Sequence, residues 1–283
     1  MPIQNVGTLL ENLVVTEATL ALLPFCHEKA PFEFLNSFAM PPYTPWVPHS
    51  QNAGFDPVTL VRVRAAKDSE LPSDIGYPEL LRANLLSNND LGPNAALLVA
   101  GAALQSRIPC RMWLNDIRNG HYGDAIPELE RIYEIARAIC GPLKGEDSSF
   151  AVRVSDTAYP GSLGDLARVL PEWTPAPGAR LGFLDPMRYR MVGRQAAETS
   201  SEDHRRWLAQ ISHDGLTCAV HFTGNSNQPD LPAEIGSLQM DAVGEGYTAS
   251  RAFKRQHYVV FVAVRSPAAG EAECVAAEIE KRV

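Results

Sequence analysis

The segment Gly178–Arg190 carries the residues that are best suited to chemistry. Its apolar run Leu181–Leu184 predicts a buried strand, and Asp185 follows that strand directly. Pro186 then ends the strand and fixes a turn, and Tyr189 comes shortly after it. An acid, a rigid turn and an aromatic ring at the carboxyl end of a strand can grip a flat polar substrate, although Asp-Pro is also a common turn.

Two more predicted strands end on an acid. The run Arg111–Leu114 leads into Asp116, and Phe150–Val154 leads into Asp156. If the sheet is parallel, both carboxylates lie with Asp185 along one edge. One carboxylate suits the vicinal diol of a ribose, and another can accept a hydrogen bond from an exocyclic amine of adenine. Because aspartate is also favoured at strand ends and helix N-caps, a nucleoside site and a purely structural role both stay open.

The elements that must position these acids alternate along the chain. We expect helices at Val14–Leu23, Pro78–Ser87, Asn94–Gln105, Tyr122–Cys140, Ser162–Leu170 and Glu202–Ser212, and further strands at Phe32–Met40 and Thr217–Phe222. The stretches Ser237–Val243 and His257–Val264 predict two strands with no crossover helix between them, and therefore an antiparallel hairpin. The pattern predicts an α/β fold in one domain, 1–283, with an inserted loop or hairpin at about 41–75, where Thr59–Ala65 alternates.

Composition narrows the classes of protein. The chain has 283 residues, of which 45% are hydrophobic and 20% charged, values typical of a globular domain with a sizeable core. No apolar run is long enough to cross a membrane, and the first residues lack the basic start of a signal peptide. The five cysteines are scattered and never in CxxC spacing, which favours reduced thiols over disulfides or a zinc site. We expect a cytoplasmic protein without a metal.

Several enzyme classes lack their motifs. The chain has no GxSxG motif of serine hydrolases, no phosphate-binding loop of P-loop nucleotidases and no HExxH pair of histidines. A formal net charge of −8 also disfavours general binding to nucleic acid, which needs a basic surface.

The order of these features resembles class I S-adenosylmethionine-dependent methyltransferases, in particular the adenine-N6 branch that has an Asp-Pro-Pro-Tyr motif. The large-subunit ribosomal RNA adenine-N6 methyltransferases are the nearest likeness. The matching segments, in order between Phe32 and Arg265, are Phe32–Tyr43 (first strand and glycine loop), Gly76–Leu86 (Pro-Gly-Ser-Pro segment and helix), Leu114–Asp116 and Ser155-Asp156 (acidic ends of the second and third strands), Leu184–Tyr189 (catalytic motif) and the final hairpin (sixth and seventh strands).

The resemblance implies a Rossmann-like class I methyltransferase fold with a mostly parallel seven-stranded sheet and a C-terminal antiparallel hairpin. It implies S-adenosylmethionine as the cofactor and an exocyclic amine of a nucleobase, RNA or DNA adenine, as the methyl acceptor. The implied cofactor-binding residues are Asn36, Phe38, Ala39, Asp116 (at the ribose) and Asp156 (at the adenine). The implied catalytic residues are Asp185 and Pro186, which accept hydrogen bonds from the target amine, and Tyr189, which stacks on the base, while Arg188 and Arg190 bind the substrate.

The chain also departs from this family. Asn36 replaces the first acid of the family, and Met40-Pro41-Pro42 replaces glycines that let the backbone approach the cofactor. The catalytic motif lacks its second proline, and its aromatic residue comes one position late. These changes fit a divergent enzyme, and they fit equally an inactive methyltransferase-fold protein that acts as a binding partner or scaffold. The acidic composition also leaves open a small-molecule methyltransferase.

A local basic patch would be needed for RNA or DNA. Candidate members are Arg188, Arg190, Arg194, Arg205, Arg206, Arg251, Lys254 and Arg255. If these residues gather beside the site, they supply the positive surface that phosphates need. They can equally form a solvated rim that pairs with Glu198, Glu202 and Asp203. A protein partner is a further possibility for such a surface.

Overall fold

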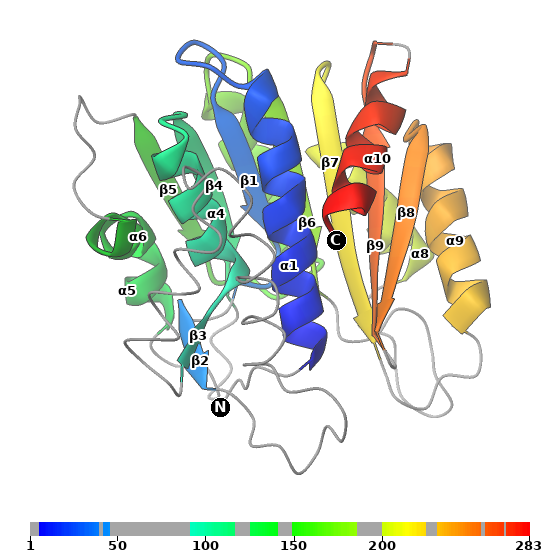
Figure 1. Cartoon of the computed structure of the whole chain (residues 1–283), viewed down its shortest axis with the longest axis horizontal. Coiled ribbons are helices and arrows are strands. Elements are labelled where there is room, and N and C mark those ends of the chain that lie inside the picture. The colour runs from blue at the N-terminus through cyan, green and yellow to red at the C-terminus, as the bar shows by residue number, and fades with distance from the viewer. Residues whose placement is uncertain are drawn as a thin grey trace.

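The computed structural model describes residues 6–39, 42–45, 91–116, 125–140, 149–185, 200–224, 231–255, 258–268 and 270–283, and its centre is a seven-stranded sheet (Figure 1). The strands are β1 (Phe32–Asn36), β4 (Cys110–Asn115), β5 (Phe150–Ser155), β6 (Ala179–Leu184), β7 (Leu216–Gly224), β8 (Ala249–Arg255) and β9 (Tyr258–Arg265). Their order is β5-β4-β1-β6-β7-β9-β8. The first five strands are parallel, and β9 runs antiparallel to both of its neighbours.

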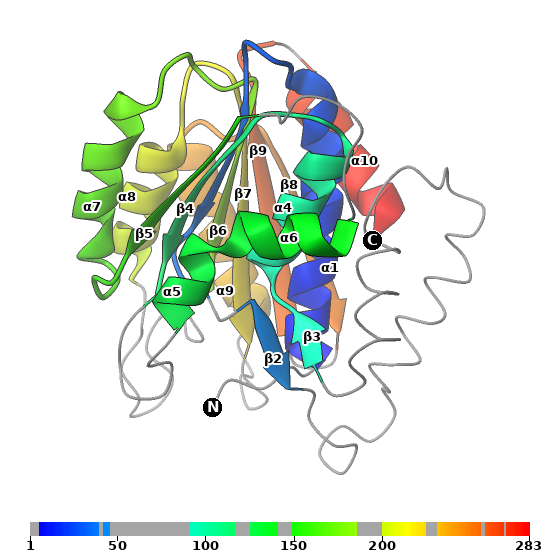
Figure 2. The same ribbon diagram turned by 90° about the vertical axis from the view of Figure 1, so that its left-hand side faces the viewer.

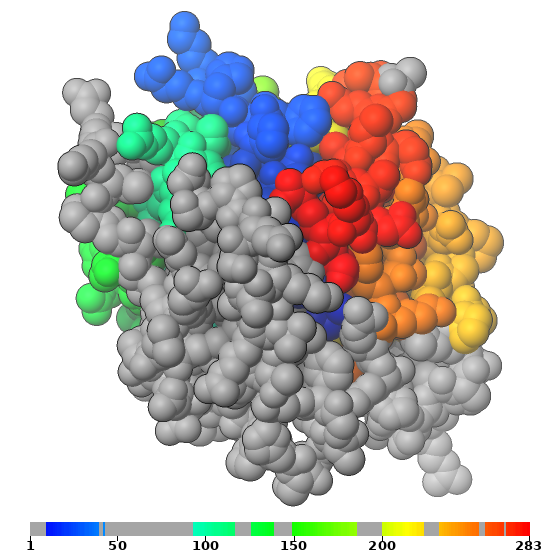
Figure 3. Space-filling model, in the orientation of Figure 1, coloured from blue at the N-terminus to red at the C-terminus, as the bar shows by residue number. Residues whose placement is uncertain are grey.

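Helices cover both faces of this sheet, as Figure 2 shows. One face carries α1 (Val6–Leu22), α4 (Ala95–Gln105), α6 (Ile132–Cys140) and α10 (Glu271–Arg282), and the other carries α7 (Ser162–Val169), α8 (Ser201–Ile211) and α9 (Leu231–Gly244). Helix α10 lies beside α1 on the outer surface (Figure 3). The remaining elements are α5 (Ala125–Glu130), the 3-10 helices η1 (Leu23–Phe25) and η4 (Leu170–Glu172), and an antiparallel pair made of β2 (Tyr43–Pro45) and β3 (Leu91–Pro93).

The alternation of side chains along the strands creates two cores. Phe32 and Phe34 of β1 pack with α1 and α4, whereas Leu35 packs with the helices α7 and α8 on the other face. Every residue of β1 is buried, as expected for a central strand of a parallel sheet. Helix α4 is buried almost all round because α1 and α6 pack against it. We call the face with α1 and α4 the α1 face.

The predicted fold class is confirmed. An α/β architecture with a mostly parallel seven-stranded sheet and an antiparallel C-terminal pair is present, in the strand order of the Rossmann-like class I methyltransferase fold. The helix predicted after Gly92-Pro93 is α4, and the Oδ1 atom of Asn94 caps it by accepting a hydrogen bond from Leu97 N (2.8 Å). No helix in the described ranges is long and apolar enough to span a membrane.

One predicted strand is wrong. Ser237–Val243 belongs to helix α9, and the first strand of the C-terminal hairpin is β8, which sequence reasoning missed together with α10. Buried Leu238 and Ala242 stand four residues apart on the inner face of α9, so the short apolar run has helical spacing. Such a run is ambiguous by periodicity alone.

The bounds of two other predicted elements differ from those in the structure. The helix Tyr122–Cys140 is two helices, α5 and α6, joined at Arg131, whose N–H bonds Glu128 O three residues back. The strand predicted to reach Met40 ends at Asn36. The predictions for Thr59–Ala65 and Pro78–Ser87, and most of the insertion at 41–75, lie outside the described residues.

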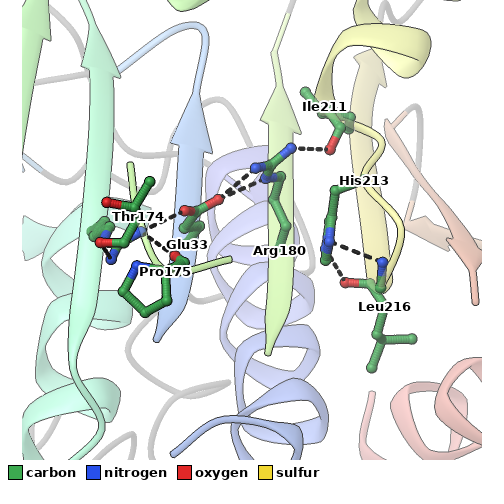
Figure 4. Close-up of polar contacts among 9 residues, drawn as sticks. Glu33, Thr174, Pro175, Arg180, Ile211, His213 and Leu216 are labelled. Atoms are coloured by element: carbon green, nitrogen blue, oxygen red, sulfur yellow. Dashed lines mark hydrogen bonds and ion pairs between the residues drawn. The ribbon is translucent and has the colours of Figure 1, made fainter. Parts of the chain in front are cut away.

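A buried charge network holds together the amino-terminal ends of three strands of the sheet, as Figure 4 shows. Glu33 of β1 has a fully buried side chain between two arginines of the neighbouring strands, at 2.7 Å from Arg180 Nη2 and 3.3 Å from Arg111 Nη1. Arg180 also donates to Ile211 O at the end of α8 (2.9 Å), and Arg111 donates to Thr174 O (2.6 Å) and Pro175 O (2.8 Å). The network therefore ties a helix and a loop to three strands.

The surroundings of the His213 ring indicate that the stability of the fold depends on pH. Its Nδ1 accepts from Gly215 N (3.0 Å) and its Nε2 donates to Leu216 O (3.0 Å), which fixes the neutral ring before β7 (Figure 4). Burial, and then the charge of Arg180, lower the pKa of His213 from 6.5 to about 4. The neutral ring of His213 therefore contributes fully to stability above about pH 6.5. As the pH drops from 6.5 toward 4, the free energy of unfolding falls by up to about 1.4 kcal/mol per pH unit.

Urea unfolding of the wild type and of His213→Gln between about pH 7.5 and about pH 5 measures this contribution. The free energy of unfolding of the wild type is expected to fall more steeply with decreasing pH than that of the variant. Buried His204 and His221 also have lowered pKa values, mainly through burial, so the variant is expected to keep part of the slope. Equal slopes in the two proteins would contradict the prediction.

Candidate functional site

The candidate site lies where the strand order reverses, at the carboxyl end of β1 between β4 and β6. Asp116 directly follows β4 and is 4% exposed, and Asp185 directly follows β6 and is 9% exposed. Strand alternation puts Asn36 with Phe34, Asp116 with Leu114 and Asp185 with Phe183 on the α1 face. Two of the three acids that the sequence predicted along one edge are thus buried at the carboxyl ends of the two strands that flank β1.

The loop after β1 is clamped between the two flanking strands. Ser37 N donates to Phe183 O of β6 (2.9 Å), and Ala39 N donates to Asn115 O of β4 (2.7 Å). The side-chain amide of Asn115 donates to Ser37 O (3.0 Å), and Asn36 Oδ1 accepts from Phe38 N (2.9 Å). These bonds fix the backbone of residues 36–39 without a glycine among the described residues of the loop.

Several buried polar atoms at this edge lack a hydrogen-bond partner in the described part of the chain. They are Ser37 Oγ, Asn115 Oδ1 and Asn12 Oδ1, each in a residue that is at most 4% exposed. Asn12 belongs to α1, and its side-chain nitrogen donates to Pro93 O (2.9 Å). An unsatisfied buried group costs about 1–3 kcal/mol, so atoms of this kind are suited to a polar ligand.

Glu11 is a buried acid that sequence reasoning missed. It lies on α1 beside Asn12 and is 2% exposed. Burial raises the pKa of the Glu11 carboxyl well above its usual value, and the negative charge of Asp185 raises it further. A glutamate within the apolar run of α1 was the available signal, because charged residues are rarely fully buried without a partner.

Asp156, the third predicted acid, is not buried as Asp116 and Asp185 are. Asp156 follows β5, which is an edge strand of the sheet, and its side chain is exposed. Its neighbours Ser155 and Thr157 both donate to Asp165 Oδ2 of α7, and these bonds lower the pKa of Asp165. Asp156 therefore stands at the rim, separated from Asp185 by the strands β4 and β1.

The side chains of the loop after β1 differ in their surroundings. The ring of Phe38 packs against that of Tyr159 at 5.5 Å between centroids, and Tyr159 in turn donates to Asp203 O (3.1 Å). Ala39 is buried. The predicted residues Pro186, Arg188, Tyr189 and Arg190, like Met40 and Pro41, lie outside the described residues. No group of three potential metal ligands occurs in the described ranges.

Three described arginines among the candidate members of the basic patch do not lie together. Arg205 and Arg206 are on α8 and pair with Glu245 (3.0 Å) and Asp203 (3.7 Å). Arg251 of β8 bonds Glu273 and Glu280 of α10, on the opposite face of the sheet. A sheet separates the two groups and carboxylates pair with each, so these three arginines fit the alternative of a solvated rim and not that of one combined patch.

Comparisons with known proteins bear on the fold. No family model matches the sequence, and no curated protein matches it. Among solved structures, protein LPL1258 from Legionella pneumophila strain Philadelphia 1, of family DUF519, has a TM-score of 0.54 at 16% identity, over 98% of this chain and 92% of that chain.

Two other solved structures are more distant. An rRNA methylase from Streptococcus thermophilus has a TM-score of 0.39 at 7% identity, over 88% of this chain and 94% of that chain. The SMU.776 protein in complex with SAH has a TM-score of 0.35 at 12% identity, over 60% of this chain and 43% of that chain. The likeness to LPL1258 establishes that this chain shares its fold.

Proposed function

We propose that this protein is an S-adenosylmethionine-dependent methyltransferase that methylates an exocyclic amine of a nucleobase, RNA or DNA adenine. The observation that carries the proposal is the pair of buried acids, Asp116 and Asp185, on either side of the clamped loop after β1. In open α/β sheets, ligands bind at the carboxyl ends of strands where the strand order reverses.

The residues present fit this cofactor. A carboxylate such as that of Asp116 suits the two hydroxyl groups of a ribose. The buried atoms Ser37 Oγ and Asn115 Oδ1 offer further hydrogen bonds to a polar ligand beside the loop of residues 36–39. Asp156 at the rim is the proposed contact to the adenine end. S-adenosylmethionine supplies, when bound, a methyl group on a positively charged sulfur.

The proposed chemistry of the protein is mainly positioning. The carboxylate of Asp185 accepts a hydrogen bond from the target amine and so orients the nitrogen lone pair. The carbonyl of Pro186 accepts a second bond, and Tyr189 stacks on the base. Arg188 and Arg190 are the proposed contacts to the substrate, since the described arginines of α8 and β8 already pair with carboxylates.

Replacing Asp116 by asparagine is expected to raise the Kd for S-adenosylmethionine about tenfold or more, because hydrogen bonds to charged groups contribute about 1.5–3 kcal/mol. Isothermal titration calorimetry measures the change. Asp214, exposed just before β7 at the other end of the sheet, provides the matched control Asp214→Asn, which leaves the Kd unchanged. Equal Kd values for wild type and Asp116→Asn would remove Asp116 from the site.

Transfer of a radiolabelled methyl group into separate pools of RNA, DNA and small molecules tests the proposed reaction. Label in RNA or DNA, released by hydrolysis as N6-methyladenine, is the expected result. Label only in small molecules would favour a small-molecule methyltransferase. Cofactor binding without transfer into any pool would favour a scaffold role, which the departures Asn36 and Pro42 from the family pattern already motivate.

A further inference from the structure

Helix α9, at one side of the molecule (Figure 1), has its charges on the inner face. Its two charged residues are Glu234 and Asp241, which are 5% and 7% exposed. Glu234 accepts a hydrogen bond from Thr223 Oγ1 of β7 (2.8 Å), and Asp241 accepts one from Ser201 Oγ of α8 (2.6 Å). A surface helix usually turns its charged residues to water. The outer face of α9 therefore presents no charge to the solvent.

The outer face of α9 exposes apolar side chains instead. Met240 is 68% exposed and Val243 is 67% exposed, and the two stand three positions apart, as neighbours on the helix surface. Among the described residues, the other large hydrophobic side chain that is exposed is Phe25, at 37%. Single exposed apolar side chains are ordinary, whereas two neighbours on an uncharged helix face indicate a contact surface.

A hollow on α8 lies next to this apolar face. Its volume is about 590 Å³, and it is lined by Ser201, Glu202, Arg205, Arg206, Ala209 and Glu245. Gly244 connects the two features, because a Cβ atom built on it would lie 4.0 Å from Arg205 Nε. Gly244 also stands four positions after Met240, on the same side of α9. The exposed side chain of Met240 and the hollow therefore belong to one continuous surface.

We propose that this surface binds a second copy of the same chain and forms a twofold-symmetric dimer. In this dimer Met240 of each copy enters the α8 hollow of the other, because a twofold axis gives every contact its reciprocal. A surface that binds itself must supply both the exposed side chain and the recess, and this surface has both side by side. The inference is independent of the proposed function, since Met240 and the hollow lie outside the candidate site.

The charges around the hollow favour a second copy over a partner of a single charge sign. The lining contains two positive side chains, Arg205 and Arg206, and two negative ones, Glu202 and Glu245. The two arginine side chains are 54% and 60% exposed, and ion pairs that are so exposed are weak. After a twofold rotation, each arginine can face a glutamate of the other copy. A nucleic acid or a strongly acidic protein would meet like charges at the glutamates.

Sedimentation velocity of the full chain, from about 1 μM to about 1 mM, tests for the dimer. The variant Met240→Lys places a charge at an exposed position, so it is expected to fold. Ala277→Lys, exposed on α10 on the other face of the sheet, is the matched control. We expect a dimer in the wild type and in Ala277→Lys, with a Kd that Met240→Lys raises about tenfold or more. A wild type that stays monomeric over this range, or an equal Kd in all three proteins, would overturn the inference.

Crosslinking tests whether Met240 enters the hollow of the other copy. Met240→Cys and Ala209→Cys are made as separate proteins, each with Cys274→Ser to remove an exposed native thiol, and are mixed with a short bismaleimide. The expected product is a dimer with one copy of each variant, identified by mass spectrometry of the joined peptides. Ala277→Cys in place of Ala209→Cys is the control and is expected to give far less product. Equal crosslinking in the two mixtures, or none in the first, would overturn the inference.

Discussion

Replacing Asp185 by asparagine is expected to lower kcat for methyl transfer about 10²–10³-fold at saturating S-adenosylmethionine, the loss typical of removing one preorganised polar contact to a transition state. The amide keeps the volume of the side chain but loses the charge and one acceptor oxygen. The target amine then lacks the group that orients its lone pair. Saturating cofactor separates the effect on transfer from any effect on cofactor binding.

Single-turnover transfer into the nucleic-acid pool that accepts the label measures this loss. Asp214→Asn, at the opposite end of the sheet, controls for a general loss of charge and is expected to retain the wild-type rate. A full rate in Asp185→Asn at saturating cofactor would refute the role assigned to Asp185. Thermal unfolding of the same samples shows whether the variant has folded.

Replacing Glu33 by glutamine is expected to lower the free energy of unfolding by about 3 kcal/mol, because breaking a buried ion pair leaves an uncompensated charge. The side chain of Arg180 is only 7% exposed, and Glu33 supplies its carboxylate partner in the network. For a loss of stability of this size, a decrease of several degrees in Tm is expected for a domain of this length. Urea unfolding followed by circular dichroism measures the change.

Two further variants give this prediction its controls. Glu33→Gln combined with Arg180→Met removes both members of the pair and is expected to recover part of the loss. Glu273→Gln breaks a pair with Arg251 in which the glutamate side chain is 60% exposed, and it is expected to change stability by less than about 1 kcal/mol. Equal small changes in Glu33→Gln and Glu273→Gln would show that the network contributes little.

The strand ends of the site could be predicted from the sequence because they depend on local patterns. The apolar runs that end at Asp116 and Asp185 are buried strands, and their parallel pairing with β1 places both acids at one edge. Asp156 has the same local pattern, but its exposure follows from the position of β5 at the outside of the sheet. Strand order is a property of the whole fold, so the sequence pattern of one strand did not contain it.

The contribution of α1 could not be predicted in the same way. Glu11 is buried because α1 packs across the sheet, and α1 lies far from β6 in the sequence. The error at Ser237–Val243 has a different cause, since a short apolar run fits both a strand and the inner face of α9. The sequence left open whether the basic residues form one patch, because only the fold places the arginines of α8 and of β8 on opposite faces.

Calorimetric titration of the wild-type protein with S-adenosylmethionine tests the central claim most directly. We expect saturable binding of one cofactor molecule, with a Kd that Asp116→Asn raises. Absence of binding up to millimolar cofactor, a concentration that detects interactions as weak as about −4 kcal/mol, would contradict it.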